Sequence, residues 1–288
     1  MFESISTHRL DHIVHLTPVA SVQEASEQFR SLGFNVLTGG THEDQLTANA
    51  LIVLADGAYF ELISFTKHVS DYPPGSPQRD ARENHRWAAK KPGWVDYGFL
   101  GNGSMDERIS DTINARANKI LYEPEFHGGR RNPSGQVLQW LITSAAAKDR
   151  IGVLPFYCGD ITPRELRASV PTSPASNVEH PNTALGFSHV HVLCKEEEIA
   201  KIAQEITYTV GHEPNTTEDS DSKRFSWPIH TSSDFDSRLI LSAPSTTEEH
   251  QFLGDRDRSA AIHEIGFRVK DERKQGSVMT PYAKIVFT

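Results

Sequence analysis

Two short apolar runs decide how this sequence is interpreted: Leu10–Leu16 (LDHIVHL) and Ala58–Phe65 (AYFELISF). Each run has the length and the aliphatic and aromatic content that are typical of a buried strand. The first run carries His12 and the second carries Glu61. If the two strands lie side by side, this imidazole and this carboxylate could share a metal ion.

The segment between the two runs completes a small module. Pro18 blocks continuation of the first strand, and apolar residues from Val22 to Leu32 then recur at the spacing of one helix face. Gly33 ends this helix, and strand-like runs follow at 34–37 and 49–54 before the closing strand. The order β-α-β-β-β predicts a first module over residues 9–66.

The remainder of the chain repeats this pattern less regularly. A proline-bearing linker is expected at 67–92, a second β-α-β-β-β-like module at 93–160 and another linker at 161–181. Residues 182–288 form a third, looser region of the same kind, with its last strand expected at the C-terminal edge. The predicted fold class is α+β, with repeated β-α-β-β-β modules forming curved mixed sheets around a cavity.

The repeat carries a histidine and a glutamate twice. Aligning the first strands superposes His12 on His189, and aligning Tyr59–Leu62 with Ile262–Ile265 superposes Glu61 on Glu264. The second module has no comparable pair, since Asp96 is the only acidic residue of its first strand. Whether His189 and Glu264 join His12 and Glu61 in one site is left open.

Charge and composition exclude several classes of protein. A net charge of −9 argues against nucleic-acid binding, which needs a concentrated basic face. No run approaches the roughly 20 apolar residues of a membrane-spanning helix, so we expect no membrane partner and a cytoplasmic location. The two cysteines, Cys158 and Cys194, lie in apolar runs and suit reduced core thiols. Serine-hydrolase, phosphate-loop and zinc-protease motifs are absent from the sequence.

Several motifs together resemble the glyoxalase-like domain family of the vicinal oxygen chelate superfamily, which includes glyoxalase I, extradiol dioxygenases and bleomycin-resistance proteins. Residues 42–49 (HEDQLTAN), 59–63 (YFELI) and 131–140 (RNPSGQVLQW) match the family's patterns. Two departures stand out, because Leu46 replaces the usual glycine and Ala48 occupies a position where many relatives have a histidine. The similarity covers residues 9–195 well and the remainder loosely.

The resemblance implies a divalent metal ion, Zn, Fe, Mn, Ni or Co, held by nitrogen and oxygen ligands. His12 and Glu61 are the expected ligands, with His189 and Glu264 as completing ligands and His42 as a candidate base. Other matching positions could line the cavity, with Arg131 suited to a carboxylate or phosphate. These positions are Asn49, Arg131 and Trp140. For Trp140 simple core packing is the competing interpretation.

The expected function is that of a metal-dependent isomerase, lyase or ring-opening dioxygenase acting on a small substrate with adjacent oxygens. The alternative is a metal-free protein that sequesters a small apolar molecule in the same cavity. Because module pairing in this superfamily often crosses a dimer interface, a homodimer also remains open.

Overall fold

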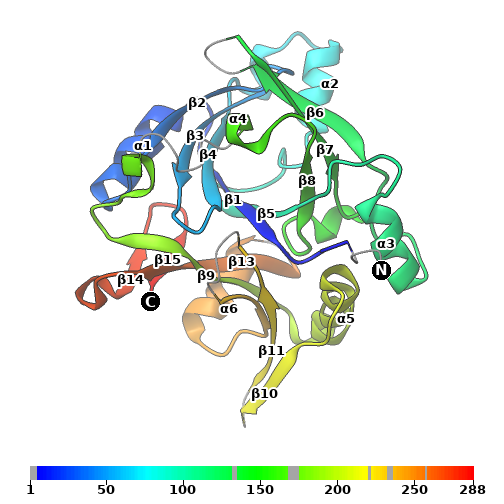
Figure 1. Cartoon of the computed structure of the whole chain (residues 1–288), viewed down its shortest axis with the longest axis vertical. Helices are drawn as coiled ribbons and strands as arrows, with labels where there is room; N and C mark the ends of the chain where they lie inside the picture. The colour runs from blue at the N-terminus through cyan, green and yellow to red at the C-terminus, as the bar shows by residue number, and fades with distance from the viewer. Residues whose placement is uncertain (1–4, 132–134, 168–174, 220–221, 232–235, 257) are drawn as a thin grey trace.

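Two curved mixed sheets make up the protein, whose structure is a computed structural model describing residues 5–131, 135–167, 175–219, 222–231, 236–256 and 258–288. Figure 1 shows the first sheet, coloured blue to green, beside the second, coloured yellow-green to red. The α+β class and the curved mixed sheets predicted from sequence are confirmed.

The first sheet combines two modules in the strand order β2-β3-β4-β1-β5-β8-β7-β6. The first module comprises β1 (Leu10–Leu16), α1 (Val22–Ser31), β2 (Leu37–Thr41), β3 (Thr47–Val53) and β4 (Tyr59–Phe65). The second comprises β5 (Gly93–Leu100), α3 (Ile109–Ala117), β6 (Phe126–Arg131), β7 (Val137–Thr143) and β8 (Phe156–Asp160). In each module the first strand runs parallel to the last, and β1 and β5 join the modules in antiparallel pairing.

The predicted linkers contain short helices. The segment 67–92 holds η1 (Val69–Asp71) and α2 (Pro77–Glu83), and the second linker holds α4 (Arg164–Arg167) and η3 (Ala175–Val178). Two side chains of α4 reach the functional site described below.

The first sheet curves until its two edge strands meet. An isolated antiparallel bridge joins His42, which follows β2, to Arg130 on β6. The right-handed twist of neighbouring strands accumulates across a wide sheet and produces this kind of curvature. The two modules therefore enclose the space in front of β1, and they do so within one chain.

The second sheet has the order β10-β11-β12-β9-β13-β15-β14. Its elements are β9 (Ala184–Cys194), η4 (Glu196–Glu198), α5 (Ile199–Val210), β10 (Asn215–Asp219), β11 (Ser222–Ile229), β12 (Ser237–Ser242), α6 (Thr247–Arg256), β13 (Ala260–Val269), η5 (Glu272–Lys274), β14 (Gly276–Met279) and β15 (Lys284–Phe287). As in the first sheet, β9 pairs parallel with β12 and antiparallel with β13.

This pairing corrects the predicted repeat. The strand parallel to β9 is β12, so β12 and not β13 corresponds to β4. Glu61 lies in register with Val14, whereas the equivalent position beside His191 is Ile240. The alignment of Glu61 with Glu264 was wrong because equal strand patterns do not reveal which neighbour a strand will pair with.

The C-terminal strand also differs from expectation. Strand β15 lies between β13 and β14, so the edge of the sheet is β14 and not the end of the chain. Its parallel pairing with β13 repeats the relation between first and last strands seen in the other modules. Residues 260–288 are therefore a reduced fourth module.

One large apolar core joins the two sheets. Phe60 of β4 packs against Phe187 of β9 and Phe267 of β13, with ring centroids 6.4 and 5.4 Å apart, respectively. Arg150, in the 3-10 helix η2 (Lys148–Arg150), adds a buried ion pair of 2.7 Å with Glu205 of α5.

Both cysteines are buried and free, as predicted. None of the helices in the described residues is both long and apolar enough to cross a bilayer.

Candidate functional site

A cavity of about 600 Å³ lies inside the curve of the first sheet. This volume is in the range of small-molecule sites. Aromatic, apolar and thiol side chains line it, namely Leu51, Tyr59, Trp87, Phe126, Trp140, Ile142, Phe156 and Cys158. Polar side chains also converge on it, namely His12, His42, Glu43, Asp44, Thr47, Glu61, His85, Arg86, His127, Arg130 and Arg167. We call this space the first-sheet cavity.

His12 enters the cavity from the middle of the sheet. Its ring stacks on Tyr59, with centroids 4.8 Å apart and an interplanar angle of 6°. Gly98 on β5 leaves room for the ring, since a Cβ atom there would lie 2.8 Å from His12 Cε1. Nδ1 of His12 lies 2.7 Å from Oδ2 of Asp11. The ring is therefore fixed through Nδ1, and Nε2 is the nitrogen left for a ligand.

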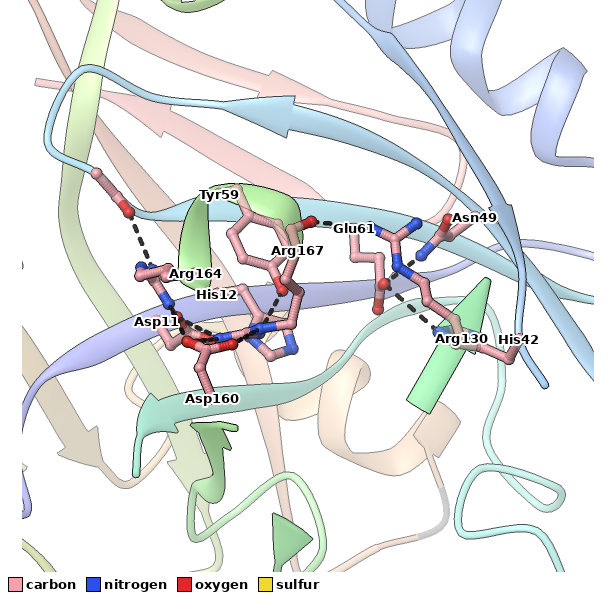
Figure 2. Close-up of polar contacts among 11 residues, drawn as sticks. Asp11, His12, His42, Asn49, Tyr59, Glu61, Arg130, Asp160, Arg164 and Arg167 are labelled. Carbon is pink, nitrogen blue, oxygen red and sulfur yellow. Dashed lines mark hydrogen bonds and ion pairs between the residues drawn. The ribbon is translucent and has the colours of Figure 1, made fainter. Parts of the chain in front are cut away.

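Asp11 belongs to a buried network with two arginines of α4 (Figure 2). Arg167 donates to Asp11 at 2.9 Å and to Asp160 at 2.5 and 2.9 Å, and Arg164 also donates to Asp11. Burial alone would raise the pKa of Asp11, but the charge of Arg167 and the bond from His12 hold that pKa well below its usual range. Asp11 is thus an ionised acceptor, and His12 Nδ1 must carry the proton.

This network was not predicted from the sequence. Asp11 directly precedes His12, and an acidic neighbour beside a candidate ligand was the available signal. Arg164 and Arg167 lie in the segment interpreted as a linker, more than 150 residues from Asp11. Only the folded chain brings them together.

Glu61 reaches the cavity from β4 and is held by Asn49. The Asn49 amide donates to Glu61 Oε1, and Asn49 Oδ1 accepts from the backbone N–H of Gly40 at 2.9 Å. Asn49 does not line the cavity, contrary to the prediction, and instead positions Glu61 through this hydrogen bond. Burial raises the pKa of neighbouring Tyr59 well above its usual range, so its hydroxyl stays protonated.

His42 stands opposite Glu61 at the closed seam of the sheet (Figure 2). Its Nδ1 lies 2.7 Å from Thr47 Oγ1, and its Nε2 lies 4.0 Å from Glu61 Oε1. The second distance exceeds a hydrogen bond. In both His42 and His12, therefore, Nδ1 is engaged by a neighbouring side chain, and the Nε2 atom of His42 faces Glu61.

The basic group of the cavity near this seam is Arg130. Its guanidinium donates to the backbone carbonyl of Arg167 at 2.8 Å, and the residue is buried. Arg131, the residue predicted to bind substrate, ends β6, and its side chain lies outside the described residues. Trp140 lines the cavity and also packs in a buried apolar cluster, and Arg167 Cζ lies 5.9 Å from its ring centroid. Both interpretations of Trp140 are therefore compatible with its position.

The predicted four-residue metal site does not assemble. His189 and Glu264 lie in the second sheet, 3.2 Å apart, whereas His12 and Glu61 lie in the first. Within the first-sheet cavity, the ligand atoms of His12, His42 and Glu61 do not all fall within 4.8 Å of one another. In the second sheet, ligand atoms of His191, His263 and Glu264 do meet this limit.

Burial also sets the protonation states of Cys158 and His85, which both line the cavity. It raises the pKa of Cys158 to about 12, so this side chain stays a thiol, as its apolar neighbours predicted. It lowers the pKa of His85 to about 4, which keeps that ring neutral near pH 7. Neither group brings charge to the cavity.

Comparisons with known proteins identify the family and the fold. A family model described as a glyoxalase-like domain matches residues 10–207, more than half of the chain. No curated protein sequence matches the chain. A hypothetical protein from Staphylococcus aureus has a similar fold, with a TM-score of 0.65, 12% identity, and coverage of 97% of this chain and 98% of that one.

Two further solved structures share the fold. A triple mutant of 4-hydroxymandelate synthase from Streptomyces coelicolor has a TM-score of 0.56 and 12% identity, over 96% of this chain and 78% of that one. A fusion protein of a xylose isomerase-like TIM barrel and 4-hydroxyphenylpyruvate dioxygenase has a TM-score of 0.51 and 12% identity, over 94% of this chain and 38% of that one. At such identities the likeness concerns architecture alone.

Proposed function

The chain belongs to the glyoxalase-like domain family of the vicinal oxygen chelate superfamily, and from this premise we propose that it is a metal-assisted enzyme acting in the first-sheet cavity. The observation that carries the proposal is that three polar side chains of one cavity are each held in a fixed orientation. His12, His42 and Glu61 each have a partner that fixes them, namely Asp11, Thr47 and Asn49, respectively. Side chains held in this way are typical of metal and catalytic sites.

The donor set fits a divalent ion in type. The Nε2 atom of His12 and the Glu61 carboxylate suit Zn, Fe, Mn, Ni or Co, and the Asp11 carboxylate, which accepts from His12 Nδ1, is a usual outer partner of such a histidine ligand. The ligand atoms of His12, His42 and Glu61 do not all lie within 4.8 Å of one another, and we assign His42 to proton transfer and not to the ion. When bound, the ion would supply Lewis acidity toward two adjacent substrate oxygens.

The remaining cavity groups define the substrate. Arg130 is buried and has no acidic partner among the described contacts, so it is available to an anionic group such as a carboxylate. Tyr59 accepts a hydrogen bond of 2.9 Å from Arg167, which leaves its own proton free for a substrate oxygen. The aromatic side chains that line the cavity add affinity for a flat or apolar body. We therefore propose a small organic anion that carries neighbouring oxygens.

Proton transfer falls to His42 at the seam. Its Nε2 lies 4.0 Å from Glu61 Oε1, which leaves it within reach of a group bound beside Glu61. It can accept a proton from a carbon or hydroxyl next to a carbonyl and return that proton to a neighbouring oxygen. This role supports isomerase or lyase chemistry on the substrate class above.

A metal-free binding protein is the second candidate. The donor separation described above and the apolar walls of the cavity favour it. In that case Arg130 and the aromatic side chains hold the ligand, and no bond of the ligand changes.

Metal analysis of the purified full-length protein separates the two functions. The variants are His12→Ala and Glu61→Gln, with His250→Ala, an exposed histidine far along the chain, as the control. We expect both cavity variants to contain one equivalent of metal less than wild type, while His250→Ala matches wild type. A folded wild type that has the same metal content as both cavity variants, and that still binds an apolar anion, would overturn the enzyme in favour of the binding protein.

A further inference from the structure

A second group of metal-capable side chains lies in the second sheet, on its two central strands. His191 on β9 is directly opposite Glu264 on β13. The pairing register shifts between Ile262 and Glu264, which marks a bulge next to His263. A bulge places two successive residues against one partner position, so His263 and Glu264 can address the same space.

The separations in this group do not fit hydrogen bonds. Nδ1 of His191 lies 3.7 Å from Glu264 Oε1, and Nδ1 of His263 lies 3.9 Å from Glu264 Oε2. A direct N–H···O bond would be about 2.7 to 3.2 Å long. Two ligand atoms bound at about 2.1 Å to the same tetrahedral ion lie roughly 3.4 Å apart. The observed distances are closer to the separation expected for a shared ion than to that of a direct hydrogen bond.

Both imidazole nitrogens are buried without a partner. His191 Nδ1 and His263 Nδ1 make no hydrogen bond within the described structure, and each residue is only 3% exposed. Leaving a buried polar atom unpaired is unfavourable, and such atoms in a folded protein call for a specific explanation. A bound cation between them and Glu264 supplies it.

Neighbouring groups hold the three side chains in place. His191 Nε2 lies 2.9 Å from Ser242 Oγ, and His189 Nε2 lies 3.2 Å from Glu264 Oε1. The ammonium group of Lys284 lies 3.3 Å from Glu264 Oε2 and balances its charge. A metal ion would compete with this ammonium group for the same carboxylate.

We propose that His191, His263 and Glu264 bind a divalent transition-metal ion that ties β9 to β13. Because both histidines are almost fully buried, the ion would be shielded from substrate and structural in role. It is separate from the ion proposed for the first-sheet cavity, since no ligand is shared and the two groups lie in different sheets.

Cobalt titration of the metal-free full-length protein tests this site. Cobalt bound by histidine and carboxylate is followed by its visible absorption and by thermal unfolding. At a concentration about 100 times the Kd we expect the Tm to rise by roughly 5 to 10 °C. His191→Gln and Glu264→Gln should each abolish one equivalent of bound cobalt, whereas His12→Ala should leave that equivalent unchanged.

Lys284→Met gives a test that does not depend on losing a ligand. Removal of the competing ammonium group should tighten cobalt binding by about tenfold or more, because the carboxylate then lacks its cationic neighbour. The proposal is overturned if wild type binds no cobalt outside the first-sheet cavity, or if His191→Gln folds and binds as wild type does. It is also overturned if Lys284→Met leaves the affinity unchanged.

Discussion

Asp11 Oδ2 accepts a hydrogen bond of 2.7 Å from Nδ1 of His12, although the two residues are consecutive on β1. In a regular strand, successive side chains point to opposite faces. The pairing of β1 with β5 shifts register between Leu10 and His12, and this irregularity allows both side chains to meet. The orientation of the first candidate metal ligand therefore depends on a local departure from strand geometry.

Replacing Asp11 by asparagine should weaken metal binding in the first-sheet cavity by about 10- to 100-fold, because the acceptor that orients His12 loses its charge. Asp160→Asn is the matched control, since Asp160 also pairs with Arg167 but does not contact His12. Metal titration of both variants measures the difference. Equal losses of affinity would mean that the arginine network, and not the bond to His12, controls the site.

Asn49→Ala should destabilise the protein by about 1 to 3 kcal/mol, because Gly40 N–H and Glu61 then lose a buried partner. It should also weaken metal binding by the Glu61 carboxylate, which would no longer be held. Urea unfolding and metal titration check the two effects. Asn84→Ala, at an exposed helix end, is the control and should change stability by less than about 0.5 kcal/mol. Unchanged metal affinity in Asn49→Ala would contradict the positioning role.

Asp56 predicts a pH dependence of stability. Its carboxylate accepts bonds from the N–H groups of Ala58 and Phe187 at 2.9 Å each, yet burial raises its pKa to about 6. A raised pKa means that the folded state binds the proton more tightly than the unfolded state does. The stability gained from protonation is thus fully present below about pH 4 and is lost as the pH rises through about 6.

Asp56→Asn removes this ionisation. From pH 4 to pH 7 the wild type should lose on the order of 2 kcal/mol of unfolding free energy relative to the variant. The lost hydrogen bond of the variant adds an offset that does not change with pH. Urea unfolding at several pH values measures the difference between the two proteins, and parallel curves over this range would contradict the prediction.

Gly98→Ala should destabilise the protein by about 1 to 3 kcal/mol and displace His12. The new Cβ would lie 2.8 Å from His12 Cε1 and 3.0 Å from Phe156 Cζ, and the His12 ring is fixed by Asp11. Gly254→Ala is the opposite case, because it lies in α6 with no atom within 4 Å of the new Cβ. That change should stabilise the protein by about 0.5 to 1 kcal/mol. Thermal unfolding of both variants checks the sign of each effect.

The sequence by itself determined the local elements and the class of fold. Apolar runs of strand length and a helical spacing between Val22 and Leu32 depend only on neighbouring residues, and these elements are present as predicted. His12 and Glu61 could be assigned to strands for the same reason. The module pattern and the family resemblance predicted that His12 and Glu61 face one cavity. Both side chains line the first-sheet cavity.

Only the tertiary structure decided which strands became neighbours. Strand β13 has the pattern of a closing strand, but its antiparallel pairing with β9 makes it the first strand of a fourth module and separates Glu264 from Glu61. Arg167 reaches Asp11 across more than 150 residues, and Arg130 lines the cavity one residue before the predicted Arg131. Pairing and register are set by contacts between distant segments, and a shift of one residue reverses the face to which a side chain points.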